Sequence, residues 1–283
     1  MLKKEIIEAA IAGHESLKEA AGALGVNYNT LRSWKQRLGL GEVAKKSIEI
    51  GKSLNILKGD PRIIGVVPDL HVPALHWDGV EWMVELFRKY NVGKVICIGD
   101  LIDNHATSRW GTYSDSLSPD DEWEAAMREL NRLHQLIPEM VIITGNHCRR
   151  VSIRSSESDI PKKFIKTLGE VVNLGGWEFW DKTGIPYEYD GVYYIHGDGL
   201  GSPNNPALQA ERMGGNTCSG HTHKLRLGFA SSPIRSLWGM QVGCLIDSGH
   251  YGMRYGANMV SKIQLGCGII DNGNPFLFEY RGG

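Results

Sequence analysis

Residues 62–71 read Arg-Ile-Ile-Gly-Val-Val-Pro-Asp-Leu-His, and they set the pattern for the rest of the chain. The first six residues form a short apolar run, which is typical of a buried strand. Asp69 and His71 follow it directly, and their spacing places both side chains on the same side of an extended chain. The stretch therefore predicts a buried strand that ends in a pair of polar, ligand-type side chains.

The same arrangement recurs further along the chain. Four more polar clusters are present, and most of the five lie directly after an apolar, strand-like run: Gly99-Asp100-Leu101-Ile102-Asp103, Gly145-Asn146-His147, His196-Gly197-Asp198 and Gly220-His221-Thr222-His223. In open α/β sheets, ligands gather at the carboxyl ends of the strands. We therefore expect these side chains to converge at one edge of a sheet.

The segments between the first three runs predict helices, one over residues 78–90 and one that begins at Ser118-Pro119. Alternation of strand and helix implies a largely parallel layer at the start of the sheet. Five later segments are also strand-like: residues 192–195, 217–219, 225–230, 259–265 and 275–280. The predicted fold class is α/β (α+β), with a two-layer sheet core flanked by helices.

Carboxylate, imidazole and amide groups delivered by several strand ends are the ligands that a two-metal hydrolytic centre requires. Mixed oxygen and nitrogen ligands without thiolates favour Mn, Fe or Zn over Mg or Ca. The predicted cofactor is therefore a pair of divalent metal ions. Mn²⁺ is the preferred ion, with Fe, Zn or Ni as alternatives.

The series D-x-H, G-D-x-x-D, G-N-H, H and G-H-x-H, over residues 62 to about 223, resembles the calcineurin-like metallophosphoesterase superfamily. The resemblance implies a calcineurin-like two-layer β-sandwich and a metal-dependent phosphoric ester hydrolase. Its nucleophile would be a hydroxide formed from water between the two ions. The implied metal ligands are Asp69, His71 and His223 for the first ion, Asp100 as the bridge, and Asn146, His196 and His221 for the second ion.

The resemblance also implies two catalytic residues beside the metals. His147 resembles the residue that protonates the leaving oxygen of the scissile phosphate, as general acid. Asp103 resembles the carboxylate that orients this histidine. Asp198, two residues after His196, is a candidate hydrogen-bond acceptor for the ring of that histidine.

The chain departs from the family pattern at Cys148, where the family usually has Asp or Glu. Arg149 and Arg150 follow it and add positive charge, so one of them could clamp a substrate phosphate. The alternative is that both arginines only begin a solvated helical turn. His105, on the polar loop after the bridging aspartate, is a further candidate for a substrate-phosphate contact.

Residues 1–40 predict three short helices, over residues 3–12, 16–24 and 28–38, and their interior resembles a helix-turn-helix DNA-binding unit. Ala21 falls where the two helices touch, and Gly25 falls where the turn needs a left-handed backbone. Val26, Leu31 and Trp34 fall at buried positions. The predicted DNA-binding residues are Asn27, Tyr28, Asn29, Arg32, Ser33, Lys35 and Arg37. The alternative is a three-helix bundle used for protein docking or oligomerisation.

A chain of 283 residues can hold one enzyme-sized domain and a small extra module. We expect a helix-turn-helix domain at residues 1–40, a linker at residues 41–60 and a metallophosphoesterase domain at residues 61–283. The net charge of −1 excludes a generally basic nucleic-acid coat, but residues 1–60 carry ten Lys or Arg against seven Asp or Glu. This slightly basic head suggests a partner of its own.

Five cysteines with no C-x-x-C spacing indicate neither a disulfide framework nor a zinc site, which favours the reducing cytoplasm, of the bacterial host if the chain is phage-encoded. No apolar stretch reaches the length of a membrane span. The sequence does not determine the oligomeric state.

The sequence thus favours a metal-dependent phosphodiesterase or nuclease that acts on DNA, with the head raising the local concentration of the substrate. One alternative is the same chemistry on a phosphomonoester, a cyclic nucleotide or a phosphoprotein. Another is a DNA-binding regulator whose phosphoesterase body is inactive.

Overall fold

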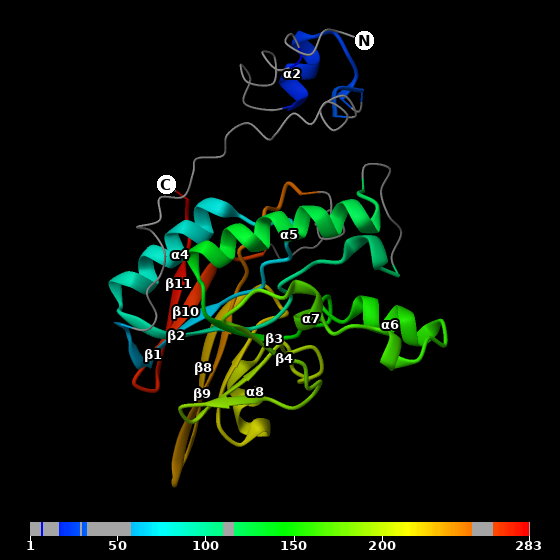
Figure 1. Cartoon of the computed structure of the whole chain (residues 1–283). Helices are drawn as coiled ribbons and strands as arrows, with labels where there is room; N and C mark the ends of the chain where they lie inside the picture. The colour runs from blue at the N-terminus through cyan, green and yellow to red at the C-terminus, as the bar shows by residue number, and fades with distance from the viewer. Residues whose placement is uncertain are drawn as a thin grey trace. The chain divides into compact units, whose positions relative to one another are not determined.

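A computed structural model describes residues 7, 17–28, 30–32, 58–109, 116–250 and 263–282 (Figure 1). The chain divides into two compact units, Met1–Lys52 and Ser53–Gly283. The linker expected at residues 41–60 lies outside the described residues up to residue 57, and strand β1 begins at Asp60.

The first unit contains helix α2 (Leu17–Ala23), and residues 28 and 30–32 are also helical. Gly25, between these helices, has a φ of 63°, which confirms the left-handed turn expected there. Ala21 and Leu31 are buried together with Ile7 and Ala20, as the helix-turn-helix pattern predicts. Trp34 lies outside the described residues.

The first sheet of the second unit has six strands in the order β11-β10-β1-β2-β3-β4. β1 to β4 are parallel, whereas β10 and β11 add antiparallel neighbours. This confirms the parallel layer that the sequence predicts. The strands are β1 (Asp60–Val67), β2 (Val92–Cys97), β3 (Met140–Ile143), β4 (Trp177–Trp180), β10 (Gly266–Asp271) and β11 (Asn274–Glu279).

The second sheet has five strands in the order β5-β6-β7-β9-β8. β6, β7 and β9 are parallel, and the two edge strands are antiparallel to their neighbours. The strands are β5 (Tyr187–Tyr189), β6 (Val192–Ile195), β7 (Asn216–Ser219), β8 (Leu225–Ser232) and β9 (Arg235–Val242).

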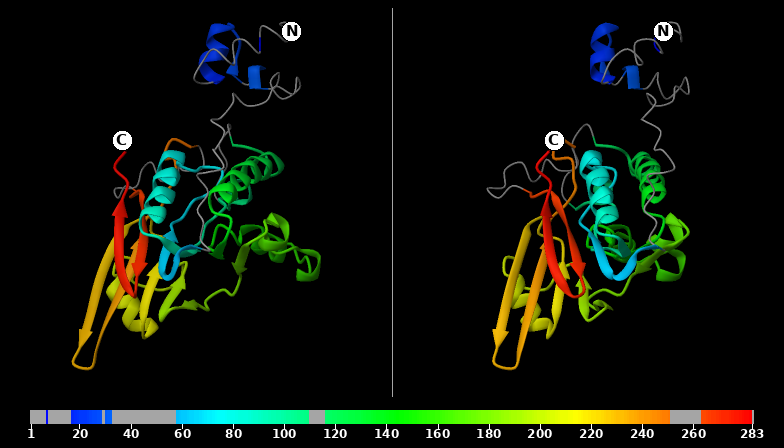
Figure 2. Two further views of the ribbon diagram at one scale, coloured as in Figure 1. Left: turned by 60° about the vertical axis from the view of Figure 1, so that its left-hand side comes forward. Right: turned by 90° about the vertical axis from the view of Figure 1, so that its left-hand side faces the viewer.

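The main core lies between the two sheets. Ile64 and Ile96 of the first sheet belong to one buried cluster with Tyr194 and Met240 of the second. Burial of these apolar side chains holds the two layers face to face. Figure 2 shows the long β8–β9 hairpin beside β10 and β11, where the two sheets come close. The two-layer β-sandwich that the resemblance implies is therefore present.

Helices α4 (Trp77–Lys89) and α5 (Pro119–Leu136) lie side by side over the first sheet (Figures 1 and 2). The apolar face of α4 packs there, and a Cβ at Gly65 of β1 would lie 2.7 Å from the ring of Phe87. Ser118 caps α5 and Pro119 occupies its first turn, as predicted. Helix α8 (Pro206–Met213) packs on the second sheet.

Several short elements complete the unit: the 3₁₀ helices η3 (His105–Thr107) and η4 (Lys162–Phe164), and the helices α6 (Arg150–Glu157) and α7 (Leu168–Val172). No helix in the described parts of the chain combines the length and the apolar character needed to cross a membrane.

One strand prediction is wrong in its position. The sequence predicts a strand over residues 259–265, but β10 begins at Gly266, and residues 259–262 lie outside the described residues. The backbone of Gln264 bonds to His223 and to Cys244 instead of to a neighbouring strand in register. The chain therefore bonds to the residues just before β8 and just after β9 before it enters the first sheet.

Candidate metal centre

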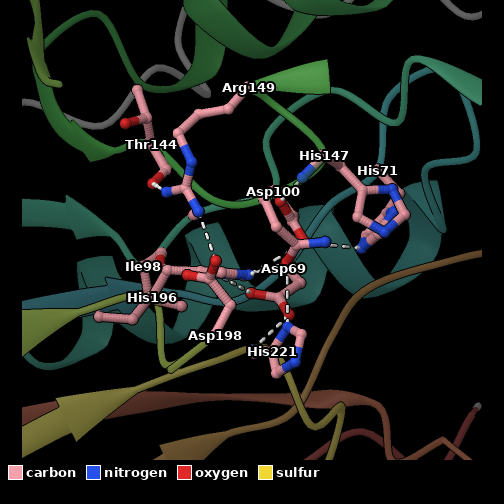
Figure 3. Close-up of polar contacts among 12 residues, drawn as sticks. Asp69, His71, Ile98, Asp100, Thr144, His147, Arg149, His196, Asp198 and His221 are labelled. Carbon is pink, nitrogen blue, oxygen red and sulfur yellow. Dashed lines mark hydrogen bonds and ion pairs between the residues drawn. The ribbon is translucent and has the colours of Figure 1, made fainter. Parts of the chain in front are cut away.

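The carboxyl ends of five strands meet at one edge of the sandwich. β1, β2 and β3 of the first sheet lead into Asp69, Asp100 and Asn146, and β6 and β7 of the second sheet lead into His196 and His221. Figure 3 shows carboxylate and imidazole groups from both sheets pointing toward one another. The convergence predicted at a sheet edge is therefore present, with both sheets contributing.

One group of possible metal ligands consists of Asp69, His71 and His223. Nε2 of His223 lies 3.3 Å from Oδ2 of Asp69 and 3.2 Å from Nε2 of His71. Asp69 and His71 are buried, and His223 is partly buried. Three ligand atoms from two turns, one after β1 and one after β7, thus lie close together.

A second group consists of Asp100, His196 and His221, with Asn146 beside it. Oδ1 of Asn146 lies 3.0 Å from Nε2 of His196 and 3.0 Å from Nδ1 of His221. Nε2 of His196 is also 3.0 Å from Oδ2 of Asp100. These are the residues that the resemblance assigns to the second ion.

Asp100 joins the two groups. Its Oδ2 atom lies 3.0 Å from Nε2 of His196 in one group and 3.7 Å from Nε2 of His71 in the other. Its Oδ1 atom accepts a hydrogen bond of 2.8 Å from the backbone N–H of His147. One carboxylate oxygen therefore faces both groups while the other fixes the turn after β3.

Hydrogen bonds on the far side of two imidazoles orient them. Nδ1 of His71 lies 3.0 Å from Oδ1 of Asp103, and Nδ1 of His196 lies 3.2 Å from the carbonyl of Ile98. When these nitrogens donate, both Nε2 lone pairs face the centre, as metal ligation requires. Asp198 does not accept from the His196 ring, contrary to the sequence prediction, because its carboxylate pairs with Arg149.

The electrostatics keep the carboxylates ionised. Burial favours the neutral acid of Asp100, but the nearby His196 and His147 hold its pKa well below the usual value. Burial acts against the charged form of Asp103 as well, and hydrogen bonds with His147 and His71 hold its pKa far below the usual value. Burial also opposes protonation of His196, yet the charge of Asp100 raises its pKa to about 9.

The backbone at this edge adopts conformations that are uncommon outside glycine. His71, Asp100, His221 and His223 have φ values of 48°, 38°, 65° and 52°. Each such residue costs on the order of 1–3 kcal/mol, and strain of this kind concentrates at functional sites. The turns therefore keep strained backbone conformations while these side chains converge.

Glycines before the polar residues give these side chains room. A Cβ at Gly145 would overlap the carboxylate of Asp100, and one at Gly220 would overlap that of Asp69. A Cβ at Gly99 would overlap the ring of His196. The glycines of the sequence motifs are thus required by close approach, and the Gly99 backbone also has a φ of 127°.

Replacement of Gly220 by alanine is expected to displace the Asp69 carboxylate and lower the affinity for Mn²⁺ by about 10- to 100-fold, the range that follows loss of ligand orientation. Isothermal titration of the full-length chain with Mn²⁺ measures this effect. Gly175→Ala is the control, because a Cβ there meets nothing within 4 Å. Equal affinities for the two variants would contradict the role of Gly220.

The residues present fit a pair of divalent cations. Oδ1 of Asp69 is buried without a hydrogen bond, although such atoms are normally paired. Nε2 of His71 and Nε2 of His223 face each other, so that at most one of them can donate to the other. Lone pairs of oxygen and nitrogen atoms therefore point at common positions, and this donor set suits Mn, Fe or Zn.

His147 stands at the edge of this centre on the Asp103 side. Its Nδ1 atom lies 2.6 Å from Oδ1 of Asp103, and its Nε2 atom lies 3.1 Å from Nη2 of Arg150. The guanidinium also donates to the Asp103 carbonyl over 2.8 Å. Because a guanidinium can only donate, Nε2 of His147 is the acceptor here and Nδ1 carries the proton.

The two residues between His147 and Arg150 have different contacts. The guanidinium of Arg149 donates to the Thr144 carbonyl over 3.1 Å and forms a close ion pair with Asp198 (Figure 3). Cys148 is buried, and burial raises the pKa of its thiol to about 12. The neutral thiol therefore does not replace the carboxylate that the resemblance noted in the sequence would place at this position.

The sequence pattern gives no hint of the role of Glu122. This buried carboxylate of α5 accepts hydrogen bonds of 2.7 Å from the backbone N–H groups of both His105 and Ala106. It thus fixes the turn that follows Asp103, and Asn104 in that turn donates to the His147 carbonyl. Glutamates are common in the first turn of a helix, so the sequence does not distinguish Glu122 from a glutamate without this role.

His105 is only 5% exposed, which does not suit the substrate contact expected of it. Among the predicted DNA-binding residues, Asn27, Tyr28 and Arg32 are exposed. Asn29, Ser33, Lys35 and Arg37 lie outside the described residues.

Residues 2–52 match the family model of a helix-turn-helix domain. No curated protein matches the chain. Among solved structures, the chain is similar to a Vps29 single mutant from Entamoeba histolytica, with 12% identity over 78% of this chain and 99% of that chain and a TM-score of 0.37.

Two further structures match similar shares of the chain. The phosphoesterase Yfce from E. coli shows 16% identity over 74% of this chain and 88% of that chain, with a TM-score of 0.38. The nuclease MPE from Pseudomonas putida shows 12% identity over 77% of this chain and 88% of that chain, with a TM-score of 0.34. At these TM-scores, none of the similarities decides the activity of this chain.

Proposed function

We propose that this chain is a dinuclear metal-dependent phosphodiesterase that acts on DNA. The observation that carries the proposal is the geometry around Asp100, which joins two groups of His and Asp ligand atoms and also holds the backbone of His147. A pair of cations next to a positioned imidazole is a recurrent arrangement for hydrolysis of phosphate esters. The sequence motifs over residues 62–223 resemble those of metallophosphoesterases, which perform the same chemistry.

Two sets of residues would hold the cations: Asp69, His71, His223 and Asp100 for one, and Asn146, His196, His221 and Asp100 for the other. When bound, such a pair supplies Lewis acidity, which activates water and neutralises the phosphate oxygens. Mn²⁺ is the ion we favour for this donor set.

His147 acts in this proposal as the general acid. Asp103 holds its Nδ1–H, so the ring is fixed with Nε2 directed away from the carboxylate. A proton on Nε2 can then pass to the oxygen that leaves when the ester bond breaks. Asp103 also holds His71, so one carboxylate aligns the acid with a metal ligand.

Arg150, and not Arg149, is the residue we assign to the substrate phosphate. The Arg149 guanidinium is engaged by Asp198 and the Thr144 carbonyl. The Arg150 guanidinium lies against Nε2 of His147, where a phosphate of the substrate must come close. A shift of this guanidinium from the imidazole to a phosphate oxygen would leave Nε2 free to take up the proton that it transfers.

Replacement of Arg150 by alanine is expected to lower kcat/KM by about 10- to 100-fold, the loss that follows removal of a charge-assisted hydrogen bond. Metal content should not change, because Arg150 touches no proposed ligand. Steady-state kinetics with a phosphodiester measure the effect, and Arg150→Lys should recover only part of it because lysine lacks the planar fork. Full activity of Arg150→Ala would remove this residue from the substrate site.

DNA is the proposed substrate because the first unit matches a helix-turn-helix domain and exposes Tyr28 and Arg32. In such domains, basic residues near the recognition helix contact phosphates. The five cysteines are all free and buried, which fits a cytoplasmic location for a protein that acts on DNA.

Replacement of Arg32 by alanine is expected to weaken DNA binding about five- to tenfold and to reduce the salt slope of binding by about one unit, as loss of one phosphate contact does. Fluorescence anisotropy over a salt series measures both quantities. Arg281→Ala is the control, since this side chain is 83% exposed and lies in the other unit. An unchanged salt slope would contradict a phosphate contact of Arg32 and favour protein docking as the role of the first unit.

A substrate panel tests the proposed activity. The Mn²⁺-loaded chain should hydrolyse bis-p-nitrophenyl phosphate and DNA faster than p-nitrophenyl phosphate. Preference for the monoester, a cyclic nucleotide or a phosphopeptide would support metal-dependent hydrolysis of phosphate esters but contradict DNA as the substrate. Binding of DNA without hydrolysis of any ester would show a regulator with an inactive body.

A further inference from the structure

Beside the candidate metal centre, the second unit contains a cavity of about 540 Å³ that the proposed mechanism does not use. Asn104, Cys148 and Arg149 line the part of the cavity next to His147. Cys148 follows His147 in the chain, and Asn104 donates to the His147 carbonyl. A substrate whose phosphate lies at His147 would therefore have a neighbouring group at the mouth of this cavity.

The lining of the cavity combines apolar side chains, lysines and the two carboxylates of Glu122 and Asp181. Ile102, Trp123 and Leu168 contribute apolar and aromatic side chains from the loop after β2, from α5 and from α7. Lys162 and Lys166 are exposed and supply positive charge at the rim. The volume lies within the range of about 300–1,000 Å³ that is usual for small-molecule sites.

A smaller cavity of about 190 Å³ lies on the other side of Arg149. The two share Thr144, Arg149 and Thr183 as lining residues, and His196 of the candidate metal centre lines the smaller one. Lys182, which also lines it, lies 4.2 Å above the ring of Trp180. The two cavities therefore adjoin at these shared residues, and the smaller one reaches His196 of the candidate metal centre.

We infer that the larger cavity binds a nucleobase of the strand whose phosphodiester lies at the metal centre. This inference rests on the proposed function and adds that the DNA substrate is single-stranded at the site of cleavage. A nucleobase is flat and largely apolar, which suits the apolar walls, and the attached phosphate backbone is anionic, which suits the lysines at the rim. Proteins bind single-stranded nucleic acids by this combination of stacking and positive charge. A base can enter only when it is unpaired, so the substrate is single-stranded DNA or a frayed end.

Two esters with the same leaving group separate this inference from the proposed function. One is the p-nitrophenyl ester of thymidine 5′-monophosphate, and the other is methyl p-nitrophenyl phosphate, which carries no nucleoside. The ratio of their kcat/KM values for the Mn²⁺-loaded full-length chain reports the contribution of the nucleoside. If the chain hydrolyses neither ester, the proposed function is contradicted. A ratio of one would contradict only the proposed base site.

Variants with matched controls locate the contribution. Val151 and Ile153 lie on α6 and are 45% and 42% exposed, but only Val151 lines the cavity. Val151→Trp is expected to reduce the ratio by about tenfold, and Ile153→Trp should leave it unchanged. Lys162 and Lys163 form a second pair, since both belong to η4 and Lys162 lines the cavity. Lys162→Ala should reduce the ratio about fivefold, and Lys163→Ala should not.

The form of the DNA gives an independent readout. Single-stranded oligonucleotides are expected to be cleaved at least tenfold faster than the same sequence in a blunt duplex. Abasic single strands should lose most of this advantage. A ratio that Val151→Trp and Ile153→Trp change equally, or equal rates on intact and abasic strands, would overturn the inference.

Discussion

Replacement of Asp100 by asparagine is expected to reduce phosphodiester hydrolysis by at least about 1,000-fold, as loss of a central electrostatic group in a reacting site does. Asparagine keeps the shape of the side chain but removes the negative charge that faces both His196 and His71. The number of Mn²⁺ ions bound per chain should fall from two to at most one. Elemental analysis and steady-state kinetics on the same preparation measure both effects.

The control for this variant is Asp120→Asn, an exposed position in the first turn of α5. It should retain both ions and full activity. An Asp100→Asn variant that retains two tightly bound ions would show that Asp100 does not join the two groups. In that case the two side-chain groups would have to act separately.

Replacement of His147 by alanine is expected to leave two Mn²⁺ ions bound and to lower kcat by about 100- to 10,000-fold for an ester with an alcohol leaving group, the usual contribution of general acid catalysis. The effect depends on the leaving group, because an alkoxide needs a proton and p-nitrophenolate does not. The loss should therefore be much smaller for bis-p-nitrophenyl phosphate than for DNA.

This difference between substrates separates an acid from a structural residue. A His147→Ala variant that loses the same factor on both substrates would show that the imidazole only shapes the site. Asp103→Asn should follow His147→Ala on the alcohol leaving group, because Asp103 holds the Nδ1 atom of that imidazole. It should also reduce metal affinity, because Asp103 holds His71 in the same way.

The parts of the fold that the sequence predicts are those whose signal is local. β1, β2 and β3 are short apolar runs, and each leads directly into a polar residue of the candidate site. Burial in a parallel layer requires continuous apolar residues, so such strands are visible in the sequence. The motif glycines are also visible, although only the structure shows that Gly145 and Gly220 leave room for carboxylates.

The parts that the sequence does not predict depend on distant partners. α6 has no buried residue, so no apolar periodicity marks it as a helix. The ion pair of Arg149 and Asp198 joins residues 49 positions apart, and it leaves Arg150 as the arginine next to His147. Nothing in the sequence distinguishes the two arginines from each other.

The sequence pattern also does not predict β9. It contains Gly239 and the buried Gln241, both unusual in a strand core. Gln241 donates to the Pro203 carbonyl over 2.7 Å, and the backbone of Pro206 leaves no room for a Cβ at Gly239. Packing of α8 against this strand, and not local propensity, therefore determines these residues.

In the proposed function, Asp100 would serve as a ligand of two divalent ions, one held with His71 and the other with His196. Electron paramagnetic resonance of the full-length chain loaded with Mn²⁺ tests it most directly, because ions that share a carboxylate are magnetically coupled. We expect two Mn²⁺ ions per chain and the spectrum of a spin-coupled pair, which Asp100→Asn abolishes. A six-line spectrum of isolated Mn²⁺ in the unaltered chain, or no bound Mn²⁺ at all, would contradict it.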